Sequence, residues 1–209
     1  WRYGSPEMRA IFSEKHKYVV WRKIWVSLAE VQHKAGLVSK KEFNDLIKYQ
    51  HDIDIHRILE IEKETKHDVV AAIKEFAEKA KIGGGKIHLG ATSMDIVDNA
   101  DTIRMKEAVE LVEKKLLILL KLFSEKVEKY AKTPCIGFTH LQPAEPTTVG
   151  YRFAFYLHDL LLDYEYLHFL KIKIKGKGLK GAVGTAASYK ALLAGNSMFP
   201  EKLEKLVME

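Results

Sequence analysis

The sequence T-P-C-I-G-F-T-H-L-Q-P-A-E-P-T-T-V-G, from Thr133 to Gly150, decides the fold because it interrupts two long helical patterns. It holds three prolines and two glycines: Pro134, Pro143, Pro146, Gly137 and Gly150. Proline fixes φ and lacks the N–H that a helix interior needs, so we predict an ordered connection and not a kinked helix. In its middle, His140 is flanked by the hydrogen-bonding residues Thr139 and Gln142. The stretch either holds one imidazole rigidly or is an ordinary loop with a solvated histidine.

Apolar residues recur every three or four positions on both sides of this stretch. From Met94 to Tyr130 they form a heptad-like seam, which predicts one helix of roughly 55 Å. A second long helix is expected after the interruption, with the same rhythm at Phe153, Leu157, Leu160, Tyr164 and Leu167. Other leucines lie off both seams, so each helix is apolar around much of its girth and needs several neighbours. We expect the missing neighbours to come from other subunits or from chain outside this sequence.

The residues before these long helices carry shorter helical patterns, among them one from Tyr18 to Lys34. Together the patterns predict an all-α protein. We expect an N-terminal helical domain over residues 1–93, followed over residues 94–209 by a helical-bundle domain that this sequence leaves incomplete. A last helix is expected to begin after Pro200.

Arg2 and Tyr3 lie at the start of the chain, just ahead of a helix that Ser5 is expected to cap. An arginine and a tyrosine together can hold a phosphate, the arginine through its fork of donors and the tyrosine through its hydroxyl. The alternative is that the pair belongs to a frayed terminus. The residues alone leave both interpretations open.

A second polar segment surrounds His67 at the expected start of a helix. Lys66 precedes it, Asp68 follows it, and the apolar residues 69–73 can anchor the backbone behind it. A histidine placed in this way can present its ring to a pocket. Taken alone, it is equally explained as a structural histidine at a helix start.

The glycine-rich segment Lys81–Ser93 delivers Thr92 and Ser93 to the start of the next helix. We reject a nucleoside-triphosphate loop, because Ile87 stands where a serine or threonine should bind magnesium. Free N–H groups, two hydroxyls and the helix dipole still make a site for a carboxylate or a phosphate. The alternative is a plain capping box.

Composition argues against several classes of partner. The 34 basic residues are interleaved with 28 acidic ones, so the net charge of +6 favours small anions and predicts no nucleic-acid partner. No apolar run reaches the length of a membrane span, and we expect no membrane contact. A single cysteine, Cys135, excludes an internal disulfide and fits a cytoplasmic protein. We discount a metal at His51–His56 because no second ligand cluster supports it.

Five blocks of sequence resemble, in the same order, the adenylosuccinate lyases, a family of the fumarase/aspartase superfamily of helical-bundle lyases. The blocks are R-Y-x-S-P-E-M (Arg2–Met8), K-H-D-V (Lys66–Val69), H-L-G-A-T-S (His88–Ser93), G-F-T-H-x-Q-P-A (Gly137–Ala144) and K-G-A-V-G-T (Lys180–Thr185). The K-H-D-V block favours this family over the argininosuccinate lyases and fumarases. The resemblance covers nearly the whole sequence and makes a functional interpretation of both histidines more attractive.

The resemblance implies a carbon–nitrogen lyase of purine nucleotide biosynthesis that eliminates fumarate from succinylated purine ribotides. It implies that His140 is the general acid for the departing nitrogen and that His67 orients the substrate with Lys66 and Asp68 beside it. Thr92 and Ser93 would bind a succinyl carboxylate, and Arg2 and Tyr3 would bind the nucleotide phosphate. It further implies no metal, no organic cofactor and a homotetramer whose active sites draw on three chains.

One departure from the family matters. The flexible signature loop S-S-x-M-P-x-K-x-N-P, which carries the serine thought to act as the base, has no match here, and Met198-Phe199-Pro200 is no substitute. We therefore expect an N-terminal portion of a longer enzyme that is inactive by itself. The alternatives are another fumarate-releasing lyase of the superfamily, or a non-catalytic helical fragment that serves in oligomerisation. An RNA-binding protein is a weak third, because the aromatic residues lie at core spacing and not among the lysines.

Overall fold

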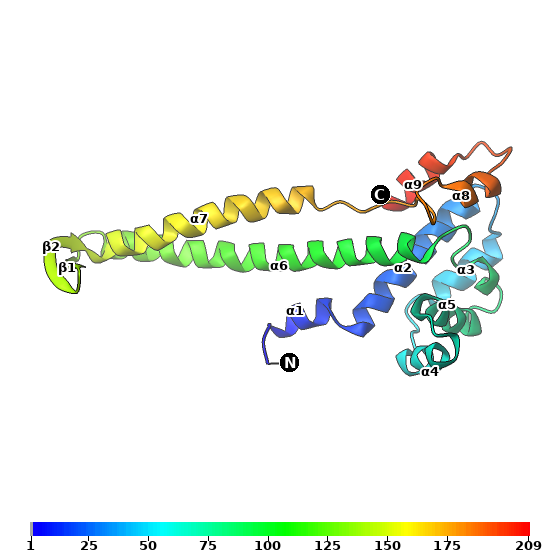
Figure 1. The fold of residues 1–209 in the computed structure, drawn as a ribbon, viewed down its shortest axis with the longest axis horizontal. Helices are drawn as coiled ribbons and strands as arrows, with labels where there is room; N and C mark the ends of the chain where they lie inside the picture. The colour runs from blue at the N-terminus through cyan, green and yellow to red at the C-terminus, as the bar shows by residue number, and fades with distance from the viewer. Residues whose placement is uncertain (1) are drawn as a thin grey trace. The chain divides into compact units, whose positions relative to one another are not determined.

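The computed structural model describes residues 2–209, which fold into helices and one small hairpin (Figure 1). The helices are α1 (Pro6–Ile11), α2 (Glu14–Lys34), α3 (Lys40–Tyr49), α4 (Ile55–Thr65), α5 (Asp68–Lys79), α6 (Ser93–Tyr130), α7 (Val149–Lys173), α8 (Ala187–Leu192) and α9 (Pro200–Met208). The other secondary-structure elements are a short 3-10 helix, η1 (Gly84–Lys86), and two strands, β1 (Pro134–Thr139) and β2 (Gln142–Thr148). The predicted all-α class is confirmed.

The chain divides into two compact units. Unit 1 holds the residues up to Met105 together with Lys175–Glu209, and unit 2 holds Lys106–Ile174. Helix α6 begins in unit 1 and ends in unit 2. The last 35 residues therefore pack with the beginning of the chain. The domains expected over 1–93 and 94–209 were drawn from sequence patterns, whereas the compact units reflect contacts in the fold, so those domain boundaries stay a prediction.

Side chains cap the N-termini of the first five helices, α1 to α5. Ser5 accepts a hydrogen bond from the backbone N–H of Met8 (3.3 Å), which confirms the predicted cap of α1. Ser39 and Glu42 form a complete capping box at α3, where each side chain accepts from the other residue's backbone N–H. Such caps satisfy the first N–H groups of a helix, which have no intrahelical partner.

The main core of unit 1 is built around α2. Trp21 and Trp25 are each 1% exposed and pack edge to face, with ring centroids 6.1 Å apart. Arg22 is buried beside them, where its guanidinium pairs with the buried carboxylate of Glu75 and lies 4.2 Å from the ring centroid of Phe76. Buried charges need such partners because desolvation is costly.

A second core in unit 1 ties the end of the chain to the other part of α2. Leu28 of α2, Tyr189 of α8 and Leu203 of α9 are each 1% exposed and belong to one cluster. The segment that links α7 to α8 contributes Leu179, also 1% exposed. Residues 175–209 therefore complete the packing of the first hundred residues.

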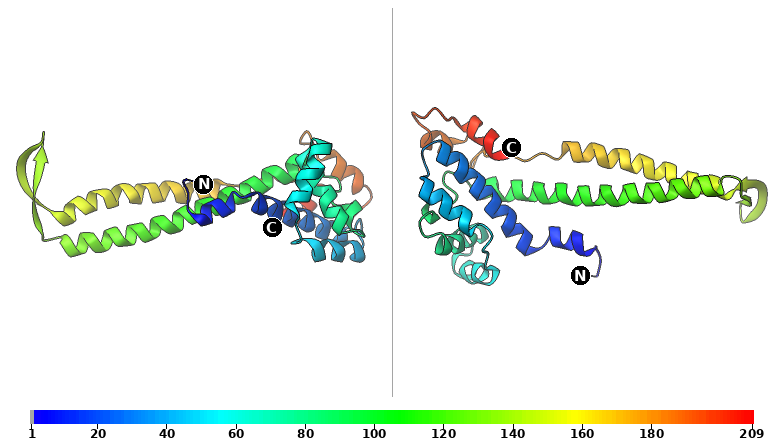
Figure 2. Two further views of the ribbon diagram at one scale, coloured as in Figure 1. Left: turned by 90° about the horizontal axis from the view of Figure 1, so that it is seen from below. Right: turned by 180° about the vertical axis from the view of Figure 1, so that it is seen from behind.

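In unit 2, α6 and α7 lie side by side in all three views (Figures 1 and 2). Phe123 of α6 and Phe153 of α7 pack edge to face, with ring centroids 5.9 Å apart. Further along, Glu113 accepts hydrogen bonds from Lys171 and His168, the latter at 3.1 Å. The long helices predicted on both sides of the interruption are confirmed. None of the described helices is long and apolar enough to cross a membrane.

The connection between these helices is an antiparallel hairpin of β1 and β2. An ordered connection was predicted and is confirmed, but its strands were not foreseen. Pro143 and Pro146 are accommodated because a two-stranded ribbon has only edge strands, where a missing N–H is tolerated. Thr139 pairs with Gln142, so the turn consists of two residues, His140 and Leu141.

Candidate active site

His67 and Ser93 lie close together in unit 1, although they come from different helices. His67 is the N-cap of α5, and its Nδ1 accepts a hydrogen bond from the backbone N–H of Val70 at 3.5 Å. The opposite ring nitrogen, Nε2, lies 3.5 Å from Oγ of Ser93. An Nδ1 that accepts a hydrogen bond leaves the ring proton on Nε2 in the neutral imidazole. This tautomer points the His67 N–H at the Ser93 hydroxyl.

Asp68 offers the same imidazole an alternative partner. Its Oδ1 lies 3.4 Å from Nδ1 of His67, and both side chains are nearly half exposed. The contact becomes an ion pair only when the histidine is protonated. Lys66 ends α4 in the left-handed conformation (φ 55°), which bulky residues rarely adopt. The K-H-D-V residues therefore form a tight corner between two helices, with the imidazole on its outer side.

His88 begins the H-L-G-A-T-S block but is not among the predicted site residues. Its Nδ1 accepts a hydrogen bond from Nε1 of the buried Trp25 (3.0 Å), and its φ is 65°. Burial lowers the pKa of His88 to about 4, with a smaller lowering contribution from His67 and an opposing one from Asp95. His88 is therefore neutral at pH 7, with its proton on Nε2.

The loop that carries Thr92 and Ser93 is held from two sides. Gln32 of α2 donates to the carbonyl of Leu89 (2.7 Å), and Ser188 of α8 donates to the carbonyl of Gly90 (2.6 Å). Gly90 has a φ of 78°, which L side chains rarely adopt, and a Cβ there would lie 2.6 Å from a methyl carbon of Leu192, so glycine suits this position. The half-buried Thr92 and Ser93 are therefore presented by a fixed backbone.

His140 occupies the turn of the hairpin in unit 2 and is exposed. Both turn residues have positive φ, 48° at His140 and 62° at Leu141, as a type I′ turn requires. This turn favours asparagine and glycine, so a His-Leu pair is strained there. Thr139, beside the histidine, lines a hollow of about 750 Å³ together with Glu145 and Arg152.

The structure brings some predicted site residues together and leaves others apart. His67, Asp68 and Ser93 meet in unit 1, with Thr92 next to Ser93. Arg2 and Tyr3 lie on the exposed lead into α1, where Tyr3 is 81% exposed. Lys66 lines a surface groove of about 570 Å³ along α4, with His56, Leu59, Glu60, Glu62 and Lys63. Within residues 2–209, no three His, Cys, Asp or Glu side chains converge as metal ligands would.

Comparison with known proteins defines the class. The sequence profile described as "Lyase" matches residues 2–206, so the chain belongs to the lyase family. The crystal structure of a fumarate lyase from Mesorhizobium sp. BNC1 superposes with a TM-score of 0.84 over 98% of this chain and 48% of that one. At 22% sequence identity, this likeness shows a shared fold.

Adenylosuccinate lyases are among the curated proteins that the chain resembles. The enzyme of Schistosoma mansoni is 37% identical over 208 residues, which are 99% of this chain and 43% of the relative. That of Methanocaldococcus jannaschii is 40% identical over 191 residues, 90% of this chain and 41% of the relative. The chain thus spans less than half the length of the curated relatives it matches.

Proposed function

We propose that this lyase is an adenylosuccinate lyase, a carbon–nitrogen lyase of purine nucleotide biosynthesis. It would eliminate fumarate from adenylosuccinate to give AMP, and from the succinylated aminoimidazole carboxamide ribotide in the same way. The observation that carries the proposal is 37% identity to an adenylosuccinate lyase across 99% of this chain. The contact between His67 and Ser93 supports it, since it joins two of the five blocks that resemble the family.

The chemistry requires a base, an acid and a stabilised carboxylate. A base removes a C–H proton next to a succinyl carboxylate, the electron pair forms the new C=C bond, and the C–N bond breaks. The departing nitrogen takes a proton from an acid, for which we assign His140 because histidine is the side chain that most often serves in general acid–base catalysis. Charge that builds on the carboxylate is stabilised by nearby donors.

Unit 1 supplies suitable donors for that carboxylate. The hydroxyls of Thr92 and Ser93 lie at the start of α6, where the helix dipole favours negative charge. His67 can orient the Ser93 hydroxyl through Nε2, which leaves the serine proton for the substrate. We assign His67 as the residue that orients substrate and supports His140, with Lys66 and Asp68 in the same binding pocket.

Arg2 and Tyr3 are assigned to the nucleotide phosphate. Both side chains are exposed on the lead into α1, so they are available to an anion. The guanidinium can bind a phosphate through two parallel hydrogen bonds, and the phenol can add a third. The substrate is thus a small molecule, and the proposal involves no metal, no organic cofactor and no nucleic acid.

The proposal includes a cytoplasmic homotetramer with shared active sites. Exposed apolar side chains on α6 and α7, such as Ile118 (55%), Phe155 (65%) and Tyr166 (71%), support association with other copies. The 209 residues contain no match to the signature loop that carries the base in the family. Residues 1–209 alone are therefore expected to be catalytically inactive, because the general acid would act without the general base.

The test is an assay of fumarate release from adenylosuccinate. The protein assayed is a longer chain that contains this sequence and matches the length of the curated relatives. We expect turnover of adenylosuccinate and none of argininosuccinate under the same conditions. Preference for argininosuccinate would assign the chain to another fumarate-releasing lyase. Assembly into an oligomer without turnover of either substrate would favour a non-catalytic oligomerisation module. Residues 1–209 alone serve as the control that should lack activity.

A further inference from the structure

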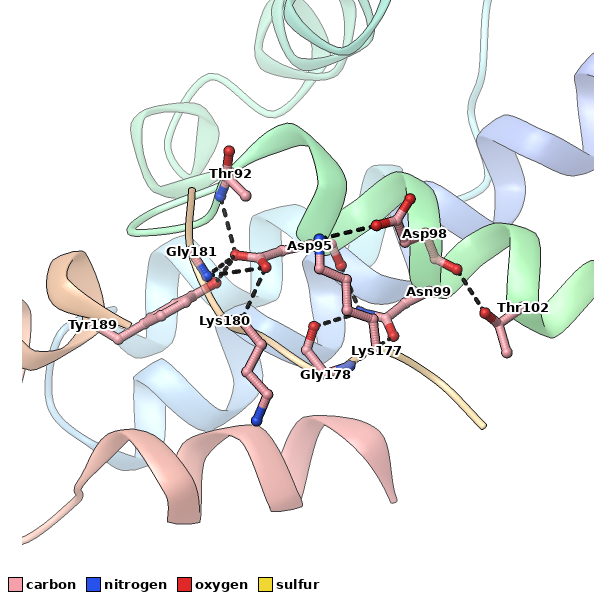
Figure 3. A network of polar contacts seen from close by, with 10 residues as sticks. All are labelled: Thr92, Asp95, Asp98, Asn99, Thr102, Lys177, Gly178, Lys180, Gly181 and Tyr189. Atoms are coloured by element: carbon pink, nitrogen blue, oxygen red, sulfur yellow. Dashed lines mark hydrogen bonds and ion pairs between the residues drawn. The ribbon is translucent and has the colours of Figure 1, made fainter. Parts of the chain in front are cut away.

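A buried carboxylate in unit 1 joins three segments of the chain (Figure 3). Asp95, in the first turn of α6, is 0% exposed. Its Oδ2 accepts from the backbone N–H of Thr92 (3.1 Å) and from the hydroxyl of Tyr189 (3.2 Å). Its Oδ1 accepts from the backbone N–H of Lys180 (2.9 Å), and the N–H of Gly181 lies 3.1 Å from both oxygens.

The donors around this carboxylate are all neutral. The ammonium group of Lys180 points elsewhere and pairs with Glu204 (2.6 and 2.7 Å). Burial raises the pKa of the Tyr189 hydroxyl, and the neighbouring Asp95 charge raises it further, so the phenol keeps its proton and donates. A buried carboxylate is tolerated only when hydrogen bonds replace its hydration. Three backbone N–H groups and one phenol therefore fix Asp95 in one orientation.

Two of the joined segments matter for the site. One is the turn with Thr92 and Ser93, whose hydroxyls are assigned above to a succinyl carboxylate. The other is the small-residue loop Gly181–Thr185, which closes through a hydrogen bond from the N–H of Ala186 to the carbonyl of Lys180 (2.8 Å). Val183 at its centre is 82% exposed. An exposed loop of this composition has no packing of its own to hold it in place.

One turn further along α6, Asn99 repeats the linkage. Its Nδ2 donates to the carbonyl of Gly178 (2.9 Å), and its Oδ1 accepts from the N–H of Gly178 (3.1 Å). The start of α6 thus holds residues 178–181 at two successive places, with Asp95 at the end nearer the site (Figure 3). Only Asp95 also holds the backbone of Thr92.

We propose that Asp95 is a positioning residue of the lyase reaction. It fixes the turn that carries Thr92 and Ser93 against the start of the loop Gly181–Thr185, so the two hydroxyls meet a succinyl carboxylate in one geometry. The inference rests on the function proposed above. It assigns Asp95 no contact with substrate, because the side chain is fully buried. A displacement of about 1 Å at a binding hydroxyl can cost about a hundredfold in rate.

The test replaces Asp95 by asparagine in the chain used for the fumarate assay. The Asp95→Asn amide would set an NH2 group against N–H donors, so the turn should shift. We expect the inhibition constant of the product fumarate to rise about tenfold to a hundredfold, as for a lost hydrogen bond to a charged group, while that of AMP stays unchanged. A substitution that only lowers the amount of folded enzyme would leave the inhibition constants of both fumarate and AMP unchanged. Asp98→Asn is the matched control, since Asp98 pairs with Lys177 (2.9 Å) and is 44% exposed.

Two further measurements keep the inference open to refutation. If Asp95→Asn does not fold, Tyr189→Phe removes one donor and leaves the three backbone ones, and fumarate inhibition should weaken in the same direction. Amide hydrogen exchange tests the linkage without substrate: exchange at Thr92, Lys180 and Gly181 should accelerate in the altered chain and not in Asp98→Asn. This holds even if adenylosuccinate proves not to be the substrate.

Unchanged exchange at these amides would overturn the linkage. Accelerated exchange with an unchanged fumarate constant would overturn the positioning role while leaving the lyase assignment intact. Failure of the unaltered enzyme to release fumarate would instead refute the proposed function. The experiments therefore separate the two ideas.

Discussion

The two units of the chain bury their apolar side chains to very different degrees. In unit 1, Trp21, Trp25 and Phe76 are at most 1% exposed. In unit 2, Phe155 and Tyr166 expose 65% and 71% of their surface. Burial of apolar surface is the dominant favourable contribution to folding. Unit 1 therefore contains most of its own stabilisation, whereas the helices of unit 2 need further surfaces to cover them.

The same contrast applies to the two histidines of the candidate site. His67 caps a helix of unit 1 whose following residues, Val69 and Ala72, are buried. His140 lies on an exposed, strained turn of unit 2. A rigid support suits a residue that orients a substrate. A strained turn on helices with exposed apolar faces is consistent with the proposal that His140 acts in an assembled oligomer.

The largest expected effect concerns His140. Replacing it by alanine should lower kcat for fumarate release by about 10²- to 10⁴-fold, the usual contribution of a general acid. The thermal midpoint should change little, because the side chain is exposed. The matched control is His158→Ala on α7, whose side chain is 72% exposed and which has no assigned role. Equal turnover in the two variants would remove the acid assignment.

A second prediction tests whether unit 1 is self-sufficient. Arg22→Met leaves the carboxylate of Glu75 buried without its cation, which should cost about 3–5 kcal/mol of unfolding free energy. Tryptophan fluorescence during urea unfolding is a suitable measure, because Trp21 and Trp25 are buried in the core of unit 1.

The control for Arg22 is another arginine of unit 1. Arg57 pairs with Glu78 at 2.7 Å, but the two side chains are 43% and 47% exposed. Solvent screens such a pair, so Arg57→Met should leave the unfolding midpoint nearly unchanged. If both variants lost equal stability, burial would not be what distinguishes the core of unit 1.

A third prediction addresses the partner dependence of unit 2. Phe155→Asp places a charge on the exposed apolar face of α7, so light scattering should find a smaller assembly than for the unaltered protein. The tryptophan fluorescence of unit 1 should stay native. Glu165→Gln, on the exposed surface of the same helix, is the control and should keep the unaltered mass. An unchanged mass for Phe155→Asp would exclude this part of α7 from the interface.

Local patterns in the sequence predict the helices well and the hairpin poorly. The cap at Ser5 and the two long helices follow from spacing that repeats along the chain. The hairpin escapes prediction because its turn, His140-Leu141, lacks the Asn-Gly signal and its strands carry prolines.

The candidate site could be predicted only in part, for a related reason. His67, Thr92 and Ser93 stand out because each lies at the expected start of a helix. His88 and Asp95 do not, since their decisive partners are distant: Trp25 lies 63 residues before His88, and Tyr189 lies 94 residues after Asp95. A sequence pattern reports neighbours within a helix turn, and long-range hydrogen bonds appear only in the folded chain.

The smallest expected effect is a pH dependence of unit 1 that originates at His88. Burial lowers its pKa from the ordinary 6.5 to about 4, so the unfolded chain binds more protons between these pH values. Stability should therefore fall as the pH decreases from about 6.5 towards 4, by at most about 1.4 kcal/mol per pH unit. At pH 7 and above, His88 should contribute no slope.

The variant His88→Gln tests this origin, because a glutamine oxygen can still accept from Trp25 but does not titrate. Urea unfolding at pH 6.5 and pH 4.5, followed by tryptophan fluorescence, should show a smaller loss of stability for His88→Gln than for the unaltered chain. The control His56→Gln changes a side chain that is 86% exposed and should keep the full loss. Carboxylates that titrate in the same range contribute equally to all three chains, so the difference isolates His88. If the three losses were equal, the imidazole would not be held neutral by the core, and the tautomer that we assign to it would lose its basis.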